Sequence, residues 1–314
     1  MPWRGASPRG STVASRPSFD EARAAATRLA GLTSLGVGGT PDFLFTPASE
    51  DEVAAVVRAC RERGVPLRVL GGGCNLLVHD GRVEGAVLSM RALRGVAVRE
   101  EAVEAAAGHP FPDLVRQSVA LGIPALPGCP GIPGQVGGVV FMNAGGRFGW
   151  VGEALVEVRG VDARGETFRR GVGPADFGYR RSPFAGCVIT GATFRRDRAL
   201  DRAAQHDLLV RARTWKQSTQ PLAAASAGCM FKNPDGPTGA RPAGLLIDTA
   251  GLKGLQVGGA QVSVLHANFL INTGTATSAD IEALAAEVVA RVRAVHGVTL
   301  EREVCCWGAP AGPA

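Results

Sequence analysis

The sequence predicts an α+β protein of two or three domains, and three observations support that prediction. The chain has 314 residues, more than one domain of ordinary size, and 46% of them are apolar, which is enough for real cores. Runs with strand-like alternation occupy residues 86–107 and 155–194, with helical patterns between and beyond them. Glycine-rich segments, with 43 glycines in the whole chain, interrupt both kinds of pattern.

The N-terminal region predicts a tail followed by two helices. Residues 1–18 have no apolar stretch of the kind that marks a secretory signal, and they predict a disordered tail; an organellar transit peptide is the alternative. Residues 19–29 predict a short helix. The sequence Ser49-Glu50-Asp51-Glu52 predicts a capping box that opens an amphipathic helix over residues 53–63.

A strand predicted at residues 65–70 runs directly into a first glycine loop, Gly71-Gly72-Gly73-Cys74-Asn75. A strand that ends in three glycines is typical of loops that hold a phosphate. Neither GxGxxG nor GxxxxGK[ST] is present, so both a Rossmann nucleotide site and a P-loop are disfavoured.

The middle of the chain predicts one helix, several strands and a second glycine segment. The helix is expected over residues 111–121. Residues 122–146 interleave eight glycines with apolar side chains, which predicts an ordered loop that faces a ligand and runs into an apolar strand or helix. Its bare amides suit an anion such as a diphosphate. Strands are expected at residues 86–90, 95–98, 102–107, 155–161, 166–169 and 187–194.

The C-terminal region predicts two helices around a loop-rich segment. The first helix covers residues 203–214, and a polar linker at residues 216–220 marks a domain boundary. After a compact loop-rich segment, Ser278 is expected to cap a closing helix. Its apolar stripe runs from Ile281 to Val295, and Gly297 ends it.

Composition excludes several classes of protein. The 34 basic and 28 acidic residues leave a net charge of +6, the arginines are spread out, and aromatic residues are 5%, so nothing supports a nucleic-acid partner. No apolar run approaches the roughly 18 residues that span a membrane. The seven cysteines are scattered and contain no CxxC, which argues against a metal site or a disulfide scaffold and predicts reduced thiols in the cytoplasm.

Three short motifs are candidates for chemistry. Cys229 stands close to a cation and a carboxamide, and a thiol with an ordinary pKa of about 8.5 donates a proton as readily as it attacks. A buried structural cysteine is the alternative, and no histidine signature supports a cysteine hydrolase. Tyr179-Arg180, before a proline turn, suits a carboxylate or a ring, with a solvated turn as the alternative. Residues 300–304 predict a strand with Glu301 and Glu303 on one face, with a solvated face as the alternative.

In combination, these segments resemble the UDP-N-acetylenolpyruvoylglucosamine reductase (MurB) family, flavoenzymes of peptidoglycan precursor synthesis. The resemblance covers roughly residues 33–308, in order and at suitable spacing. Its pieces are Thr33-Ser34 with Gly36 to Gly39, GGGCNLLV at 71–78, GIPGQVGG with MNAGG within 131–146, YRRSPF at 179–184, QPLAAASAGCMFKNP at 220–234, GLLIDTAGLKGLQVGGAQVS at 244–263, HANFLIN at 266–272 and LEREV at 300–304.

The resemblance implies a fold and a reaction. The fold is an FAD-binding cradle of the vanillyl-alcohol-oxidase (PCMH) type in two subdomains, residues 19–94 and 95–215. A C-terminal α+β substrate-binding domain covers residues 216–314, and its last strand returns toward the flavin. The reaction is NADPH-dependent reduction of UDP-N-acetylglucosamine enolpyruvate to UDP-N-acetylmuramate with non-covalent FAD. Hydride passes from NADPH to flavin N5 and from there to C3 of the enolpyruvyl ether.

The resemblance also implies residue roles. Arg180 and Glu303 stabilise the enolate, and Cys229 gives the proton to C2 where the family usually has serine. Tyr179, Lys232 and Asn233 bind the substrate, the last two at its diphosphate or uridine. The implied FAD-binding residues are Gly71, Gly72, Gly73, Cys74, Asn75, Gly131, Gly134, Gly137, Gly138 and Asn143.

Some features depart from the family pattern, and other readings stay open. Leu32 replaces a frequent asparagine, residues 146–149 replace an Ala-Tyr-Gly segment, and the chain's single tyrosine predicts the shorter class, which lacks an extra loop with a substrate-stacking tyrosine. An FAD oxidase of the same fold and a non-catalytic nucleotide-binding module are the alternatives. We expect a small-molecule substrate, no nucleic-acid or membrane partner, no metal, and a monomer or weak homo-oligomer.

Overall fold

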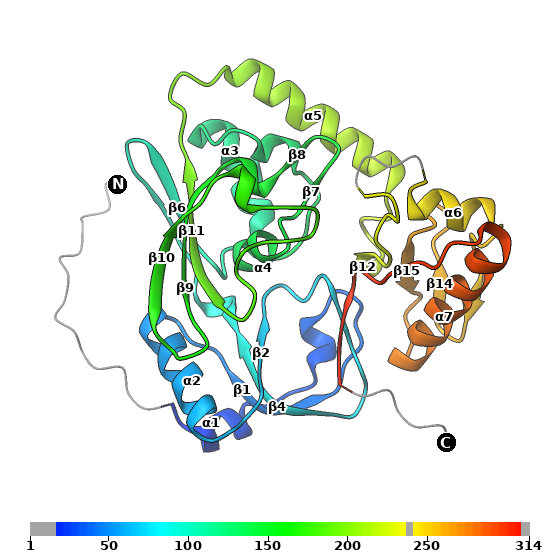
Figure 1. Ribbon diagram of the computed structural model, residues 1–314, viewed down its shortest axis with the longest axis horizontal. Coiled ribbons are helices and arrows are strands. Elements are labelled where there is room, and N and C mark those ends of the chain that lie inside the picture. Colours follow the sequence, from blue (N-terminus) through cyan, green and yellow to red (C-terminus); the bar gives the residue numbers. More distant parts are fainter. Residues whose placement is uncertain (1–16, 237–240, 309–314) are drawn as a thin grey trace.

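The computed structural model describes residues 17–236 and 241–308, and three sheets of three or more strands organise this part of the chain (Figure 1). Most of the tail predicted at residues 1–18 lies outside the described residues. Ser18 is described, and its hydroxyl caps α1 (Phe19–Ala24) by accepting the Glu21 N–H at 3.2 Å. The helix ends at Ala24, earlier than the sequence predicts.

The first sheet is parallel and has the order β1 (Thr40–Phe45), β4 (Arg82–Ser89), β2 (Leu67–Leu70). The chain passes between β1 and β2 through α2 (Glu50–Glu62), which buries one apolar side as predicted. Ser49 caps this helix, but the Glu52 carboxylate accepts the N–H of Ala48 rather than that of Ser49. The predicted capping box is therefore only half formed.

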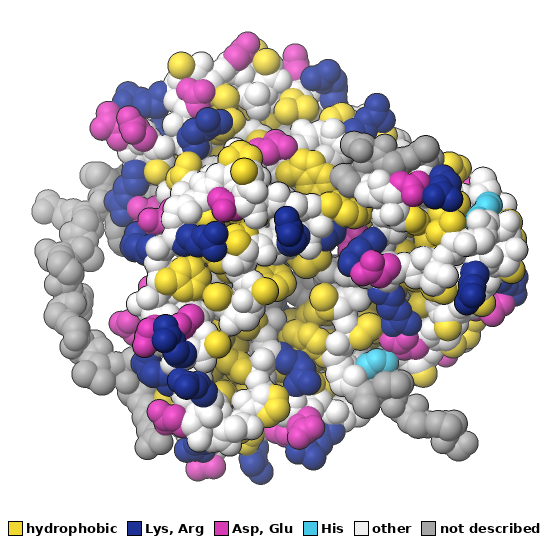
Figure 2. Space-filling model, viewed as in Figure 1, with side chains coloured by type: hydrophobic (Ala, Val, Ile, Leu, Met, Phe, Trp, Pro, Cys, Tyr) yellow, Lys and Arg dark blue, Asp and Glu magenta, His cyan; other side chains and the backbone are white. Residues whose placement is uncertain are grey.

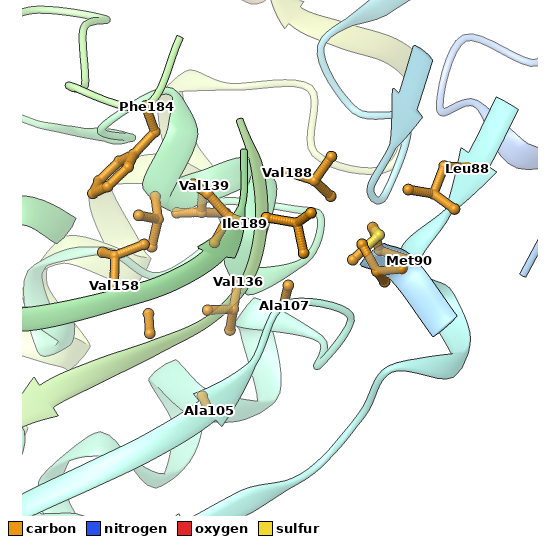
Figure 3. Close-up of a cluster of buried hydrophobic side chains, with 14 of the residues drawn as sticks. Leu88, Met90, Ala105, Ala107, Val136, Val139, Val158, Phe184, Val188 and Ile189 are labelled. Atoms are coloured by element: carbon orange, nitrogen blue, oxygen red, sulfur yellow. The ribbon is translucent and has the colours of Figure 1, made fainter. Parts of the chain in front are cut away.

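The second sheet is antiparallel and follows the predicted strands closely. Its order is β10 (Thr167–Gly171), β9 (Leu155–Val161), β11 (Val188–Arg195), β6 (Ala102–Ala106), β5 (Val96–Val98). Helix α3 has the predicted bounds, Phe111–Leu121, and ends at Gly122 in the left-handed conformation. The second glycine segment runs into a helix, α4 (Val136–Phe141). Val136 and Val139 of α4 are buried in the same cluster as Ile189 of β11 (Figure 3).

The third sheet lies beyond α5 (Arg202–Thr219), and it corrects two predictions. Residues 216–219 continue the helix instead of forming a linker. The segment expected to be loop-rich forms an antiparallel sheet with the order β12 (Ala225–Cys229), β15 (Phe269–Asn272), β14 (Ala260–Val262), β13 (Gln256–Val257). Its strands are short and rich in small or polar residues, so alternation does not reveal them.

Two helices, α6 (Ala243–Thr249) and α7 (Ser278–His296), pack with this third sheet. Thr277, not Ser278, is the N-cap of α7, and it forms a capping box with Asp280. We call the parts of the chain built around the first, second and third sheets the first, second and third modules. Ser278 faces the first module, where Asp80 accepts its N–H at 2.8 Å. Gly297 ends α7 as predicted, but Val295 at the end of the stripe is 59% exposed.

The last described strand returns to the first module. Residues 300–304 are extended but form no strand; the strand is β16 (Cys305–Trp307), which pairs in parallel with β3 (Leu76–Val78). The short hairpin β7 (Gly145–Gly146) and β8 (Gly149–Trp150) follows α4. Strand β3 directly follows the first glycine loop, and its partner β16 begins two residues after Glu303. The pairing of these two strands therefore brings the Glu303 segment close to the loop.

Candidate active site

A cavity of about 1110 Å³ lies where the three modules meet. Figure 2 shows a hollow near the middle of the molecule, with hydrophobic side chains around it. Both glycine loops line this cavity, and so do Cys229, Arg180 and Glu303. The volume is at the upper end of ligand pockets in proteins, which leaves room for more than one bound group.

The two glycine loops, residues 71–75 and 131–138, form one surface that we call the glycine cradle. They touch backbone to backbone: a Cβ on Gly72 would lie 2.5 Å from the Cα of Gly134. Gly138 faces open space, with nothing within 4 Å of an added Cβ. The side-chain oxygen of Gln135 is buried at this wall and has no hydrogen-bond partner among the described residues. The cradle therefore offers close approach to backbone and an unsatisfied polar atom, as a bound group requires.

Arg180 and Glu303 form an ion pair at the cavity wall. The Arg180 Nε donates to the Glu303 carboxylate, and the two side chains are 18% and 9% exposed. Burial raises the pKa of Glu303, although the Arg180 guanidinium opposes that change. Arg180 also lies over the rings of Trp150 and Tyr179, at 5.6 and 5.2 Å from their centroids. The guanidinium is thus held against aromatic rings, with a carboxyl group of shifted pKa beside it.

Cys229 ends β12 and completes this group. Burial raises the pKa of its thiol, and the nearby Glu303 carboxyl raises it further, to about 12 in all. Arg180 and Lys216 lower this pKa, but by less. The side chain is therefore a neutral thiol at physiological pH, able to give a proton but poorly able to attack as a thiolate.

Backbone pairing explains why Cys229 and Glu303 meet. The residues after Cys229 run beside the segment that carries Glu303: the Glu303 N–H donates to the Met230 carbonyl at 2.9 Å, and the Lys232 N–H donates to the Glu301 carbonyl at 2.8 Å. The Asn75 amide donates to the Glu303 carbonyl at 3.2 Å. Asn75 therefore joins the glycine cradle to the same segment.

Lys216 is a cavity residue that the sequence does not single out. It lines the cavity from α5, and burial lowers its pKa, while the nearby thiols of Cys129 and Cys229 act in the opposite direction. Helical spacing is the sequence pattern that could have revealed Lys216. It follows the buried Ala212 by four residues and so lies on the same face of the helix. Expecting a linker at this position hid that relation.

The remaining predicted residues lie outside the cavity lining. The hydroxyl of Tyr179 accepts the Asn233 N–H at 3.3 Å, and the Asn233 side-chain oxygen accepts the Ala243 N–H at 3.0 Å. Lys232 pairs with exposed Glu301. Asn143, predicted to bind the cofactor, is buried, and its amide donates to the Gly178 carbonyl at 3.0 Å. It therefore supports the turn before Arg180, because both its side-chain groups are occupied by protein backbone.

Comparison with known proteins identifies the family. A model described as "UDP-N-acetylenolpyruvoylglucosamine reductase, C-terminal domain" matches residues 220–307. A protein named UDP-N-acetylenolpyruvoylglucosamine reductase from Synechococcus sp. (strain RCC307) is 39% identical over 288 residues, 89% of this chain and 92% of that relative. The chain belongs to the UDP-N-acetylenolpyruvoylglucosamine reductase family. A relative of the same name from Methylorubrum extorquens is 41% identical over 289 residues, 91% of this chain and 92% of that relative.

The family assignment accounts for the fold. The crystal structure of UDP-N-acetylenolpyruvylglucosamine reductase (MurB) from Thermus caldophilus matches with a TM-score of 0.74 and 33% identity, covering 90% of this chain and 98% of that chain. A model described as "FAD binding domain" matches residues 41–171. The predicted α+β fold, an FAD-binding module of the PCMH type followed by the family's C-terminal module, is confirmed, as is the enzyme class, a flavin-dependent oxidoreductase.

The glycine cradle fits FAD. The unsatisfied Gln135 oxygen and the open face of Gly138 lie within the segment that the FAD-binding model covers. No helix among the described residues is long and apolar enough to cross a membrane. No group of three or more potential metal ligands occurs in residues 17–236 and 241–308.

Proposed function

We propose that this protein reduces UDP-N-acetylglucosamine enolpyruvate to UDP-N-acetylmuramate, with NADPH as reductant and FAD as non-covalent cofactor. The observation that carries the proposal is the convergence of Cys229, Arg180 and Glu303 on one cavity, beside the glycine cradle. Protonation of an enolate needs an acid that gives the proton and polar groups that stabilise the negative charge. Cys229 can serve as the acid, and Arg180 and Glu303 can serve as the stabilising groups.

The glycine cradle is proposed to hold the diphosphate of FAD through backbone amides. Gly71, Gly72, Gly73, Cys74 and Asn75 approach it from one side, and Gly131, Gly134, Gly137 and Gly138 from the other. When bound there, FAD would supply the hydride chemistry that links NADPH to C3 of the enolpyruvyl group. Asn143 would act indirectly, since its amide holds the turn that carries Arg180.

Arg180 and Glu303 are proposed to bind the substrate carboxylate and to stabilise the negative charge that develops at C2. The Arg180 guanidinium presents further N–H donors beyond the one given to Glu303, and aromatic rings lie against it. The raised pKa of Glu303 favours a shared or retained proton, which lets this carboxyl approach a carboxylate without full repulsion.

Cys229 is proposed to give the proton to C2. A pKa of about 12 keeps the proton on sulfur until charge builds on the substrate. Proton transfer forms an S⁻ group in a buried position, and the two cations that act on this thiol are Arg180 and Lys216. Both line the same cavity and are placed to compensate that charge, and Arg180 has the larger effect on the thiol.

Several finer assignments belong to this proposal. Cys229 stands in the place of the usual serine, and the chain belongs to the shorter class without the extra loop. Tyr179, Asn233 and Lys232, beside the cavity, bind the sugar nucleotide. The proposed domains are residues 19–94, 95–215 and 216–314, and the last of these boundaries falls inside α5, which runs to Thr219. Seven free cysteines fit a reducing cytoplasm, and the chain acts as a monomer or weak homo-oligomer.

The test is NADPH oxidation by the FAD-loaded enzyme, with and without UDP-N-acetylglucosamine enolpyruvate. We expect this compound to accelerate reoxidation of the reduced flavin and to yield UDP-N-acetylmuramate. If the compound leaves reoxidation unchanged, the substrate assignment is wrong. A protein that binds no FAD would favour the non-catalytic nucleotide-binding alternative.

A further inference from the structure

A second charged cluster lies behind the catalytic carboxyl, outside the cavity lining. We call it the Glu282 clamp: Glu282 of α7 with His79, Arg302 and Cys306. Arg302 grips Glu282 with both terminal nitrogens, Nη1 to Oε1 at 2.7 Å and Nη2 to Oε2. The His79 ring lies 3.5 Å from Oε1, and the Cys306 thiol donates to it at 3.6 Å. Two other chain segments, one at His79 and one at residues 302–306, therefore meet on the Glu282 carboxylate.

The clamp is partly shielded from water. The His79 side chain is 5% exposed, and Glu282 and Arg302 are 22% and 32% exposed. Burial alone would raise the pKa of Glu282, but the Arg302 hydrogen bonds and His79 lower it below its ordinary value. The Glu282 carboxylate is therefore ionised at neutral pH, and the fork of Arg302 is held in two parallel hydrogen bonds.

The clamp is adjacent in sequence to a catalytic residue. Neighbouring side chains of an extended segment point to opposite sides, so Arg302 turns toward α7 while Glu303 turns toward the cavity. Arg302 also forms a backbone bridge with Phe231, two residues beyond Cys229. Fixing Arg302 thus fixes the direction of the next side chain.

The clamp also joins modules. The His79 N–H donates to the Trp307 carbonyl at 2.9 Å, and next to it Asp80 and Ser278 exchange two hydrogen bonds. The start of α7 is therefore fastened to the FAD-binding module at the same place where Glu282 grips Arg302. The Asp80–Ser278 hydrogen bonds and the Glu282 clamp together hold the third module against the first module, which contains the first glycine loop.

We propose that Glu282 is a positioning residue for the reduction, acting through Arg302 to set the Glu303 carboxyl against Arg180 and the substrate. This inference rests on the proposed function, because it assigns Glu303 to the substrate half of the reaction. Loss of the clamp would let Glu303 rotate or shift, and displacements near 1 Å at a reacting group cost large factors in rate.

The chain offers a matched control on the same helix. Glu287 and Arg291 form an exposed ion pair on α7, with Nε to Oε1 at 2.6 Å, and neither residue lines the cavity. Glu287→Gln and Glu282→Gln each remove one carboxylate charge from α7. Arg302→Lys keeps the charge of the clamp but removes its two-pronged grip.

The experiment measures the two half-reactions of the FAD-loaded enzymes separately, together with FAD content and melting temperature. We expect Glu282→Gln to slow flavin reoxidation by UDP-N-acetylglucosamine enolpyruvate roughly tenfold while flavin reduction by NADPH keeps its wild-type rate. Arg302→Lys should slow reoxidation by a smaller factor, and Glu287→Gln should match the wild type in both steps.

Three results would overturn the inference. Reoxidation of Glu282→Gln at the wild-type rate removes the positioning role. An equal fall of both half-reactions means that the clamp serves only the fold, and if Glu282→Gln does not load FAD, Arg302→Lys decides between these readings by the same comparison. A wild-type enzyme that the enolpyruvyl compound does not reoxidise overturns the proposed function itself.

Discussion

Arg180 has φ of +53°, in the left-handed region that costs a residue with a side chain about 1–2 kcal/mol. The turn persists because Gly178 and Arg181 exchange backbone hydrogen bonds and because Asn143 holds the Gly178 carbonyl. Backbone strain of this kind is often found at functional sites, where a side chain must hold one direction. Here it aims a guanidinium at Glu303 and the cavity.

Replacing the sulfur of Cys229 tests its role as proton donor. Cys229→Ser keeps a proton on the same atom position, and we expect it to retain substantial activity. Cys229→Ala leaves no donor and should lower kcat by about 10²–10⁴, the usual contribution of a general acid. Steady-state reduction of UDP-N-acetylglucosamine enolpyruvate measures both variants, with flavin reduction by NADPH as the control. Normal turnover by the alanine variant would contradict the assignment.

Glu303 makes the stability of the protein depend on pH in a definite direction. Its pKa is raised in the folded state, mainly by burial, so the unfolded chain loses this proton first as pH rises. The folded state then binds more protons, and the free energy of unfolding falls with pH between the ordinary and the raised pKa. Glu303→Gln should remove that decline, as urea unfolding across this pH range will measure. Parallel curves for the two proteins would argue against the raised pKa.

At the level of single residues, the sequence predicts the reactive residues of the site better than the residues that surround them. Cys229, Arg180 and Glu303 could be singled out because they stand in short motifs of distinctive chemistry, and all three line one cavity. Lys216 and Gln135 were not singled out, since an isolated lysine or glutamine has no motif, and only tertiary packing brings them to the wall.

Helices and strands with strong periodicity are the elements that the sequence predicts well. Helix α3 and strand β9 have the predicted bounds, because apolar spacing and a terminal glycine define them. Strands β12 to β15 are short and interrupted by small residues, and their pairing comes from contacts far apart in sequence. Local patterns do not carry that information.

Two glycines of the cradle separate folding from cofactor binding. A Cβ at Gly72 would collide with the Gly134 backbone, so Gly72→Ala should lower both stability and FAD affinity. Gly138→Ala meets nothing within 4 Å and lies within α4, so it should raise the free energy of unfolding of the apoprotein by up to about 1 kcal/mol. It should nevertheless weaken FAD binding, because the methyl group fills space at the cradle.

Thermal unfolding with and without added FAD measures both glycine variants. The cradle assignment predicts a smaller FAD-induced rise in melting temperature for Gly138→Ala than for the wild type. An unchanged rise would place the cofactor away from Gly138.

For the whole molecule, the mode of flavin attachment distinguishes the proposed reductase from an oxidase of the same fold. We expect acid precipitation of the FAD-loaded protein to release the flavin into solution, because the contacts proposed for the glycine cradle are hydrogen bonds from backbone amides, which are lost when the protein unfolds. The supernatant absorbance at visible wavelengths measures release. Colour that stays with the precipitated chain would favour the oxidase, and the cysteines that line the cavity would be the first attachment points to examine.

The pairing of β16 with β3 has a consequence for synthesis of the enzyme. Residues 305–307 complete a ladder with residues 76–78, which leave the ribosome far earlier. Until the later segment emerges, β3 has an open edge, and the wall behind the cradle lacks Glu303 and its clamp. A nascent chain halted before residue 300 would therefore lack Glu303 and the partner strand of β3, so we expect no reductase activity until residues 300–307 have been made.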